Sequence, residues 1–347
     1  MRVISRHDAN IRRDNPVFHL LFRAIEAAGV TVDRFSPWKL LTRRYDIYHI
    51  HWPEKHMARR SRLRALLYTL AELVLMDVAR WRGARVVWTA HNAKSHEGWH
   101  PRLEAWCWRT SLRRVDGCLH FSRAGRDLIR ARFPQLRDRP HFVVPHGHYR
   151  DIYPNRVSRA EARARLDLPE DTGVCLFLGA IRGYKNVPGL IAAFHDLPGS
   201  DRRLVIAGRA TPPGLAAAVA AGAERDGRIR FHPDFVDEAD IQHYMNAADV
   251  VVLPYSDILN SGSAMLALSF DRPVLVSDRG AMRELRERTG PDWVRLFEPP
   301  LDARDLEAAL AWSRRPQRPA RCDCAWGDPA RVAAGTIDAY RAILARG

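Results

Sequence analysis

The chain alternates between short apolar runs with strand character and longer segments whose apolar residues recur at helical spacing. In the first part, Gly29 and Gly83 stand where two of the helical segments should end. Repeated strand–helix–strand order predicts a parallel sheet with helices on both faces. The strand-like runs of this part are at 1–5, 45–52, 84–92, 117–122 and 141–147.

The same pattern restarts after a linker near residue 155. Val174–Ile181 is almost wholly apolar, which is typical of a parallel strand buried on both faces. Helical segments again separate the strand-like runs that follow, at 202–208, 228–236, 249–255 and 273–278.

We therefore predict an α/β protein of two doubly wound, Rossmann-like domains that face a cleft. The 347 residues suit two domains of roughly 150 residues each. We place the first domain at 1–153 and the second at 154–325. The closing segment, 326–347, has apolar positions at helical spacing and can pack back on the first domain.

The composition is globular and strongly basic. The chain is 46% hydrophobic and 27% charged, with 55 Lys and Arg against 40 Asp and Glu, a formal charge of +15. All the cations are arginine except Lys39, Lys55, Lys94 and Lys185. A positive surface favours polyanions, phosphorylated substrates or anionic lipid as partners.

The cysteines and the apolar stretches point to a cytoplasmic protein. Five scattered cysteines favour a reducing compartment over a disulfide framework. The first residues contain no apolar core of signal-peptide length. The most apolar stretch, Leu63–Ala79, contains Arg64, Glu72 and Asp77 and is too short and too charged to span a bilayer.

Polar and glycine-rich loops follow the strands of the second domain, where doubly wound sheets bind ligands. One loop, “GAIRGYKN”, contains Gly179, Arg182, Gly183 and Lys185. Its glycines allow close backbone approach, while the two cations can neutralise oxyanions. A solvated surface loop is the alternative interpretation.

A second loop, Asn260–Ser263, is rich in small polar residues and leads into an apolar segment. A Ser-Gly-Ser sequence at a helix start offers free N–H groups, hydroxyl donors on Ser261 and Ser263, and the positive end of the helix. An ordinary serine cap is the alternative. Two anion-suited loops at two strand ends of one sheet favour a shared phosphate or diphosphate.

These stretches resemble a known family. “FLGAIRGYKNVPGLIAAF”, “RRLVIAGRA” and “VVLPYSDILNSGSAMLALSFDRPVLVSDRGAMREL” look like the nucleotide-sugar half of a GT-B glycosyltransferase. “DIYHIHWPE”, “VVWTAHNAKSHE” and “VVPHGHYRDIYP” are similar to bacterial exopolysaccharide transferases, in particular the xanthan-type β-mannosyltransferases. The resemblance covers nearly the whole chain and is more specific for the fold than for the sugar.

The resemblance implies roles at the strand ends. Arg182 and Lys185 would neutralise the donor diphosphate, and Glu284 would bind donor hydroxyls. The strand end at Val236 would lie near the nucleobase. The donor-binding residues expected are Gly179, Arg182, Lys185, Gly208, Val236, Tyr255, Asn260, Ser261, Gly262, Ser263 and Glu284.

One departure from the family pattern favours an inverting reaction. Many retaining relatives have two glutamates eight residues apart, where this chain has Ile258 and Leu266. Inversion needs one general base to take the proton of the acceptor hydroxyl. The candidates from the first domain, in order of preference, are Glu97 with His91, and then Glu54. The alternatives are surface carboxylates and, for His91, a loop histidine or a contact to the donor sugar.

No metal site or cofactor is expected. His49 and His51 share one face of a strand, and His91, His96 and His100 are close in sequence, but no cysteine or carboxylate completes a ligand set at standard spacing. In the family, cationic side chains and a helix end replace the metal.

The first domain combines arginines with Trp81, Trp99, Trp106 and Trp108 beside apolar helix faces, which suits an anionic membrane surface. The alternative is tryptophans in the core and arginines in water. The family acceptor, a polyprenyl-diphosphate-linked oligosaccharide, would present its head at such a surface. We therefore expect a peripheral protein at the inner membrane.

The leading hypothesis is an inverting glycosyltransferase of bacterial exopolysaccharide synthesis. By resemblance it would move mannose from GDP-mannose to the lipid-linked oligosaccharide. A UDP-sugar donor and a sugar-nucleotide epimerase of the same fold are alternatives. A basic nucleic-acid-binding protein is disfavoured, because no recognised module occurs and the arginines are spread along the chain; no nucleic-acid partner is expected.

Overall fold

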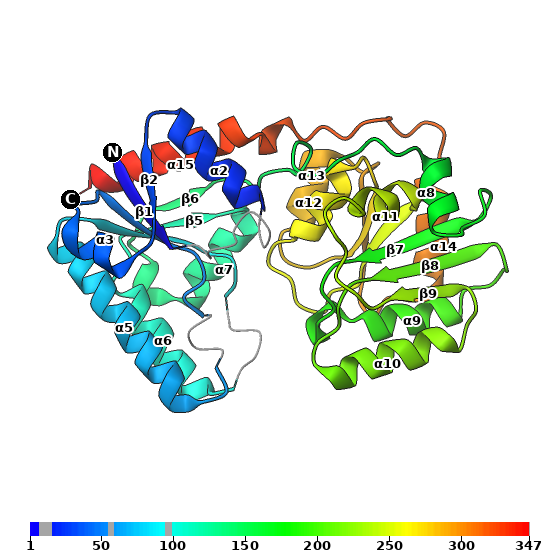
Figure 1. Cartoon of the computed structure of the whole chain (residues 1–347), viewed down its shortest axis with the longest axis horizontal. Coiled ribbons are helices and arrows are strands. Elements are labelled where there is room, and N and C mark those ends of the chain that lie inside the picture. The colour runs from blue at the N-terminus through cyan, green and yellow to red at the C-terminus, as the bar shows by residue number, and fades with distance from the viewer. Residues whose placement is uncertain (7–15, 55–58, 94–98, 347) are drawn as a thin grey trace. The chain divides into compact units, whose positions relative to one another are not determined.

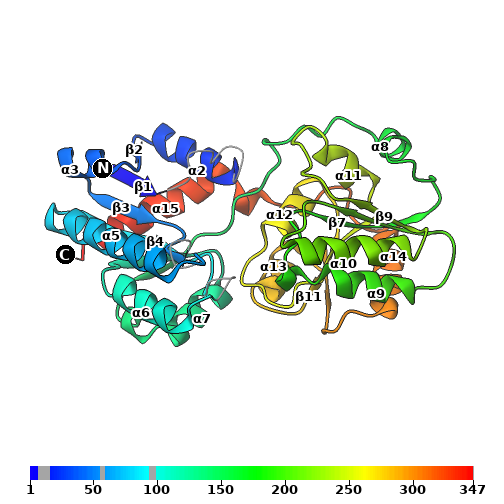
Figure 2. The same cartoon turned by 60° about the horizontal axis from the view of Figure 1, so that its bottom comes forward.

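The computed structural model describes residues 1–6, 16–54, 59–93 and 99–346. It divides into two compact units. Unit 1 is Met1–Gly147 with Trp326–Gly347, and unit 2 is His148–Ala325. In each unit helices cover both faces of a parallel sheet, as Figures 1 and 2 show. The expected α/β class with two Rossmann-like domains is confirmed.

The sheet of unit 1 has six parallel strands in its described residues, in the order β2-β1-β3-β4-β5-β6. Neighbouring side chains face opposite sides, so Tyr48 and Trp88 enter one core while Ile47 and Val87 enter the other. The strands are β1 (Arg2–Arg6), β2 (Thr31–Arg34), β3 (Ile47–Ile50), β4 (Arg85–Thr89), β5 (Gly117–His120) and β6 (His141–Val143).

Two groups of helices cover the sheet of unit 1. α5 (Arg62–Trp81), α6 (Pro101–Leu112) and α7 (Arg123–Arg132) contribute to the core around Trp88, and α3 (Pro37–Thr42) packs against α5. On the other face α2 (Pro16–Ala27) lies beside α15 (Pro329–Leu344), the blue and red helices of Figure 1.

The packing of α15 confirms that the C-terminal helix belongs with the first domain. Tyr340 is fully buried, and its hydroxyl shares a 2.7 Å hydrogen bond with Nδ1 of His49 on β3.

Two helix ends are also as expected, because Gly29 and Gly83 have φ of +83° and +94°, which favours glycine after a helix.

The sheet of unit 2, again counted over described residues, has six parallel strands in the order β12-β11-β10-β7-β8-β9. Every residue of the central strand β7 is buried, as its apolar sequence predicts. The strands are β7 (Gly173–Leu178), β8 (Arg202–Ala207), β9 (Ile229–His232), β10 (Val250–Leu253), β11 (Val274–Ser277) and β12 (Val294–Phe297).

The helices of unit 2 alternate with these strands. Capping boxes at Ser158–Glu161 and Asp302–Asp305 begin two of them. The helices are α8 (Arg159–Arg165), α9 (Val187–His195), α10 (Pro213–Glu224), α11 (Ile241–Ala247), α12 (Gly262–Ser269), α13 (Met282–Thr289) and α14 (Ala303–Ser313), with a 3₁₀ turn η2 (Gly183–Lys185) before α9.

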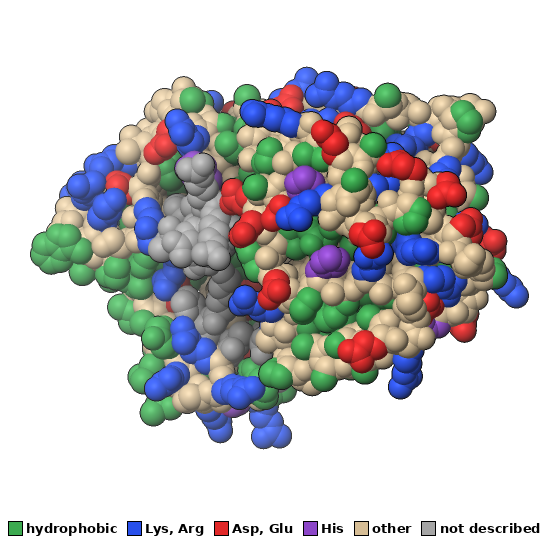
Figure 3. Space-filling view, turned by 45° about the vertical axis from the view of Figure 1, so that its right-hand side comes forward, with side chains coloured by type: hydrophobic (Ala, Val, Ile, Leu, Met, Phe, Trp, Pro, Cys, Tyr) green, Lys and Arg blue, Asp and Glu red, His purple; other side chains and the backbone are tan. Residues whose placement is uncertain are grey.

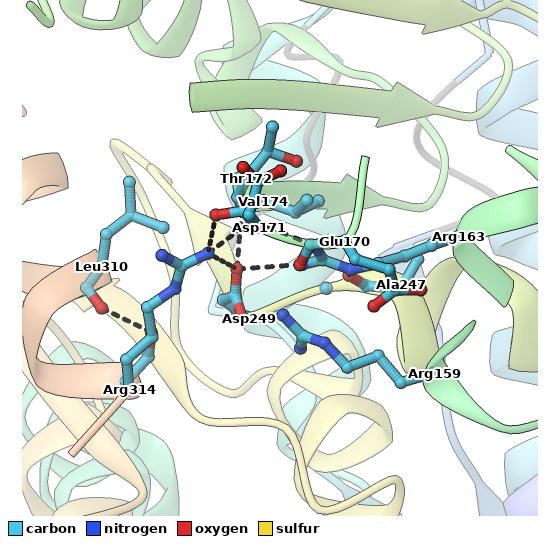
Figure 4. A network of polar contacts seen from close by, with 12 residues as sticks. Arg159, Arg163, Glu170, Asp171, Thr172, Val174, Ala247, Asp249, Leu310 and Arg314 are labelled. Atoms are coloured by element: carbon cyan, nitrogen blue, oxygen red, sulfur yellow. Dashed lines mark hydrogen bonds and ion pairs between the residues drawn. The ribbon is translucent and has the colours of Figure 1, made fainter. Parts of the chain in front are cut away.

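Asp249 joins the amino-terminal ends of β7 and β10 (Figure 4). Its carboxylate accepts the N–H of Val174 at 2.8 Å and pairs with the guanidinium groups of Arg159, Arg163 and Arg314 at 2.7, 3.2 and 3.1 Å. Burial acts to raise the pKa of Asp249, but the Val174 N–H and the arginines outweigh it and lower that pKa. This network ties helices to the edge of the sheet opposite the strand ends expected to bind ligand.

The units divide between Gly147 and His148, a few residues before the expected boundary at 153/154. Residues just after Gly147 bond within unit 2: the N–H of Tyr149 donates to Ser269 Oγ at 2.9 Å, and Arg150 pairs with Asp271 at 2.7 Å. The sequence prediction also did not include α3, β12 and α14.

Candidate functional site

Two glycines bring the loops after β7 and β8 together in unit 2. Gly179 has φ +129° and Gly208 has φ +140°, which side-chain-bearing residues rarely adopt. A Cβ at Gly208 would clash with the carbonyl of Gly179. The pairing continues beyond them, because the N–H of Ile181 donates to Arg209 O at 2.9 Å and that of Thr211 to Ile181 O at 3.0 Å. The two loops therefore form one continuous backbone surface.

Lys185, at the end of η2, is a buried cation beside this surface. Lys185 is 9% exposed, and its Nζ lies 5.4 Å from the ring centroid of Tyr255 and 6.0 Å from that of Phe177. Burial lowers the pKa of Lys185. Among the described residues no carboxylate forms an ion pair with it. A bound anion would therefore compensate a charge that the fold leaves largely desolvated.

The start of α12 has the helix-capping geometry expected at Asn260–Ser263. Ser261 Oγ accepts the N–H of Ala264 at 3.0 Å, and Ser261 O accepts that of Met265 at 3.2 Å. The N–H groups of Gly262 and Ser263, which have no partner within a helix, are left as donors for a ligand. Ser261 Oγ therefore accepts the capping N–H, and its predicted role as a hydroxyl donor stays a prediction.

Lys185 and Ser263 converge on Gly179. A Cβ built on Gly179 would lie 3.6 Å from Lys185 Nζ and 3.8 Å from Ser263 Oγ. Tyr255 donates its hydroxyl to Ser263 Oγ at 3.2 Å, which leaves the Ser263 proton to donate elsewhere. The two anion-suited loops therefore share one place in unit 2.

Three further contacts fix the loop between β10 and α12. The N–H of Ser256 donates to Tyr184 O at 2.9 Å, which ties the loop to η2. Ser277 Oγ donates to Tyr255 O at 2.8 Å. Gly280 has φ +56°, and a Cβ there would clash with the carbonyl of Ile258. These serines and Gly280 were not among the predicted site residues, although Ser256 directly follows the strand predicted at 249–255, and Ser277 and Gly280 lie within two residues of the end of the strand predicted at 273–278.

The remaining donor-side residues are less closely tied to this place. Asn260 is half-buried, and Arg182 is exposed at the start of η2. Glu284 is buried on α13 and pairs with Arg288 at 3.1 Å. Val236 is half-buried. Their roles toward a donor stay predictions.

β9 ends four residues earlier than the expected strand at 228–236. It stops at His232, because Pro233 has no N–H to continue the ladder. Val236 is therefore in the loop that follows the strand, not at the strand end.

Of the candidate bases in unit 1, Glu54 and His91 lie in the described residues and Glu97 lies outside them. Glu54 is buried and accepts the Asn92 amide at 2.8 Å. His91 is half-buried, and its ring stacks on Trp52 at 4.2 Å between centroids. Because Asn92 follows His91 directly, the two candidates belong to one cluster.

A second histidine orients His91, which sequence reasoning did not predict. Nδ1 of the buried His51 shares a 3.2 Å hydrogen bond with Nε2 of His91, and Nε2 of His51 is 3.3 Å from Ser5 Oγ. A base held by a second group in this way is typical of proton-transfer sites. The signal for this pair is the alternation of His49 and His51 on one predicted strand, a pattern that was interpreted above only as a candidate metal site.

One cluster of metal-ligand type is present among the described residues. Cys118, His120 and His141 offer ligand atoms within 4.8 Å of one another. The two imidazoles already hydrogen-bond each other at 2.8 Å, and His141 Nε2 lies 2.9 Å from Leu136 O. These contacts fit a packed histidine pair, and the expectation of no metal site stays a prediction.

The four tryptophans of the expected membrane patch divide into two pairs. Trp81 is 84% exposed, and Trp99 is also exposed. Trp108 is instead buried against Trp88 and Phe133, with ring centroids 5.5 and 5.2 Å away. The prediction that Trp108 belongs to the membrane patch is therefore wrong. Trp106 is half-buried and packs against the same core.

Known proteins match this architecture. Residues 172–313 match the family model described as glycosyl transferases group 1. The chain is 31% identical over 323 residues to the GDP-mannose:glycolipid 4-beta-D-mannosyltransferase of Xanthomonas campestris pv. campestris, covering 92% of this chain and 85% of that one.

Solved structures of the same fold cover the whole chain. The sucrose-phosphate synthase of Thermosynechococcus elongatus superposes with a TM-score of 0.72 at 17% identity, over 100% of this chain and 99% of that one. Anabaena HepE, solved with UDP and glucose, gives 0.68 at 15% identity over the same shares. The chain belongs to the group 1 glycosyltransferases and has their GT-B fold.

Proposed function

We propose that the protein transfers mannose from GDP-mannose to a glycolipid, with inversion at the anomeric carbon. The donor and the acceptor class follow the printed activity of the Xanthomonas relative, which matches along 92% of this chain. The acceptor we propose is a polyprenyl-diphosphate-linked oligosaccharide of exopolysaccharide synthesis. Such an acceptor is anchored in lipid, so the enzyme would work peripherally at the inner membrane.

The observation that carries the proposal is the convergence of Lys185 Nζ and Ser263 Oγ on Gly179. A nucleotide diphosphate there would receive one ammonium group, one hydroxyl and the N–H groups at the start of α12. Gly179 and Gly208 leave the backbone bare, so phosphate oxygens can approach closely. The proposal assigns charge neutralisation to these groups and not to a divalent cation.

In the proposed step, the acceptor hydroxyl oxygen forms a bond to the anomeric carbon while the bond from that carbon to the diphosphate breaks. The electron pair of the broken bond leaves with GDP, whose terminal phosphate gains charge. Lys185 and the start of α12 stabilise this charge more strongly in the transition state than in the bound donor. The proton of the acceptor hydroxyl goes to the general base.

We assign the base to the cluster around His91, with Glu54 and Glu97 as the alternatives to test. In a neutral His91 whose Nε2–H donates to His51 Nδ1, the basic lone pair is on Nδ1. After Nδ1 takes the proton, His51 can still accept the Nε2–H of the imidazolium, and Ser5 can accept the Nε2–H of His51. The positive charge formed on the half-buried His91 ring is then stabilised by the hydrogen bonds that run through the buried His51 to Ser5.

We propose inversion because two positions on the donor side have apolar residues where retaining relatives have glutamates. The positions where retaining relatives have glutamates are Ile258 in the β10–α12 loop and Leu266 in α12. Neither side chain can act as a nucleophile or as an acid on the donor side. The single displacement described above needs neither.

A donor screen tests the function. Purified protein is mixed with GDP-mannose, UDP-glucose or other sugar nucleotides and a lipid-linked oligosaccharide, and nucleotide release and product are measured. We expect release of GDP from GDP-mannose that depends on acceptor, and a β-linked product by NMR. An α-linked product would contradict inversion, release from a UDP-sugar alone would change the donor, and interconversion of the sugar nucleotide without acceptor would indicate an epimerase.

A further inference from the structure

Helix α5 is apolar on two opposite faces. Its inner face packs on the sheet of unit 1, with Leu73, Met76 and Ala79 in the core. Polar groups on that face have partners: Glu72 accepts the Tyr48 hydroxyl at 2.9 Å and pairs with Arg6. Packing inside unit 1 therefore explains the inner face and leaves the outer one unexplained.

The outer face exposes a stripe of large apolar side chains. At 100° per residue these side chains fall within an arc of about 60° on the helix surface. Trp81 is 84% exposed, and each of the others is more than two-fifths exposed. The stripe consists of Leu63, Leu67, Leu70, Val74 and Trp81.

The neighbouring helix α3 extends this surface. α3 packs against α5, and its Trp38 and Leu41 are exposed by 73% and 50%. We call these seven residues on α3 and α5 the apolar face. Eleven large hydrophobic side chains are exposed in the described part of the chain, so this one face holds more than half of them. Isolated exposed hydrophobics are common, but such a gathering marks an interaction surface.

Cations surround the apolar face. Arg62 and Arg64 flank its beginning in the first turn of α5, where Arg59 lies over the Tyr68 ring at 4.1 Å. At the other end of α5, Arg80 pairs with Asp116 at 2.5 Å and Arg82 donates to Arg43 O at 3.3 Å, so these two are engaged within unit 1. The one acidic residue near the stripe, Asp77, is paired with Arg114 at 2.7 Å. Figure 3 shows green and blue side chains gathered along the left edge of the view, where unit 1 lies.

We infer that the apolar face inserts into the surface of an anionic lipid bilayer, with α5 lying in the plane of the interface. Leucine and tryptophan on one stripe, with arginines at the flanks, is the pattern of a helix buried to the depth of the headgroups. The arginines can meet lipid phosphates while their stems and the tryptophans stay in the interfacial layer. In the described residues no helix has the length and apolar character needed to cross a membrane.

A second copy of the chain fits this surface less well. A symmetric dimer would bring the same face of two copies together, and with it two sets of arginines. Like charges across an interface oppose association. An anionic bilayer offers the opposite charge to the same arginines.

The inference deepens the proposed function, because it names the surface that would hold the enzyme where a lipid-linked acceptor lies. Its geometric basis is independent of the donor site in unit 2. Vesicle binding and sugar transfer can therefore fail separately, and the experiment below measures both.

The test is co-flotation with vesicles of phosphatidylcholine, with and without phosphatidylglycerol. The face variant is L67S/V74S/W81S, and the matched control is Leu128→Ser, an exposed apolar residue on α7 outside the face. The charge variant is R62E/R64E. All four proteins are also assayed for GDP-mannose turnover with a detergent-soluble acceptor, and their mass is measured by analytical ultracentrifugation without lipid.

We expect wild type and Leu128→Ser to bind the anionic vesicles equally, and the face variant to bind at least about tenfold more weakly. The charge variant should lose the preference for phosphatidylglycerol, and salt should weaken binding of the wild type. Turnover with the soluble acceptor should be the same in all four. Equal vesicle binding by the face variant would overturn the inference, as would a wild-type dimer that the face variant abolishes.

Discussion

Lys185 and Ser263 lie 78 positions apart in the sequence, yet both reach the same side of Gly179. A Cβ on Gly179 would be 3.6 Å from Lys185 Nζ and 3.8 Å from Ser263 Oγ. The two loops therefore bring an ammonium group, a hydroxyl group and a backbone segment without a side chain next to one another.

Lys185→Ala should lower activity without lowering the stability of the folded protein. Loss of the ammonium group removes stabilisation of the leaving diphosphate, so kcat/KM should fall about 100-fold or more. The folded protein should not lose stability from the lost charge, because Lys185 is buried and has no carboxylate ion pair among the described residues. Steady-state kinetics and thermal unfolding of the same preparations check both parts. Arg225→Ala, an exposed cation at the end of α10, is the control.

Gly179→Ala should lower both stability and donor affinity. The residue is at φ +129°, so any side chain strains the backbone by about 1–3 kcal/mol, and the methyl group would stand between Lys185 and Ser263. Gly214→Ala is the matched control, because a Cβ there meets open space in α10 and should stabilise slightly. Urea unfolding and titration with GDP measure the two effects. Equal behaviour of both variants would contradict the assigned site.

His91→Asn should slow turnover about 100-fold or more while GDP-mannose affinity changes little, because a general base acts in the transition state. Glu54→Gln and Glu97→Gln, assayed beside it, decide between the three candidates. His51→Asn should give a smaller loss, since it removes only the partner of His91. If His91→Asn turns over normally and Glu97→Gln does not, the base is Glu97.

Asp249→Asn should destabilise unit 2 without changing donor binding. The carboxylate joins three arginines and the Val174 N–H at the edge of the sheet opposite Gly179. Loss of the carboxylate charge leaves the fully buried guanidinium group of Arg163 without its ion-pair partner, at a cost of about 3–5 kcal/mol. Thermal unfolding and GDP titration give the two readouts, and a large loss of GDP affinity in the folded variant would contradict this purely structural role.

Unfolding stability should fall as the pH drops below about 6.5. Burial, with the neighbouring His141, Arg126 and Arg130, lowers the pKa of His120 to about 3, against which Asp127 acts weakly. As the pH falls below about 6.5, His120 takes up a proton in the unfolded chain but not in the folded one. The contribution of His120 to the free energy of unfolding is therefore fully present above pH 6.5. It is lost toward pH 3 by about 1.4 kcal/mol per pH unit for this group.

The test of that pH dependence is urea unfolding at several pH values, with His120→Phe as the comparison. The variant should show a shallower dependence below pH 6.5. If the variant does not fold, NMR titration of the wild-type imidazole gives the same answer. A His120 signal that titrates near 6.5 would contradict the prediction.

The sequence was informative where a local pattern decides the structure. Apolar runs located most strands, and Ser261 capped the predicted helix. Because parallel strands end at one edge of a sheet, the sequence alone predicted that the loops of Lys185 and Ser263 come together. What no local pattern contains is the burial of Lys185 beside Tyr255, which depends on how three loops pack.

Other features depended on tertiary contacts that periodicity does not reveal. α5 is apolar nearly all round, so its sequence does not tell which stripe meets the sheet and which stays outside. Trp108 and Trp81 belong to similar arginine-rich helices, yet one is in the core and the other is exposed. Asp249 precedes an ordinary apolar strand, and only the fold brings three arginines to it.

The most direct test of the central claim is calorimetric titration of GDP into wild type, Lys185→Ala, Ser263→Ala and the double variant, with guanosine as the ligand without phosphates. The account predicts that each single substitution weakens GDP about tenfold or more, that the two effects are not additive, and that guanosine binding is unchanged. Equal GDP affinity in all four proteins would contradict it.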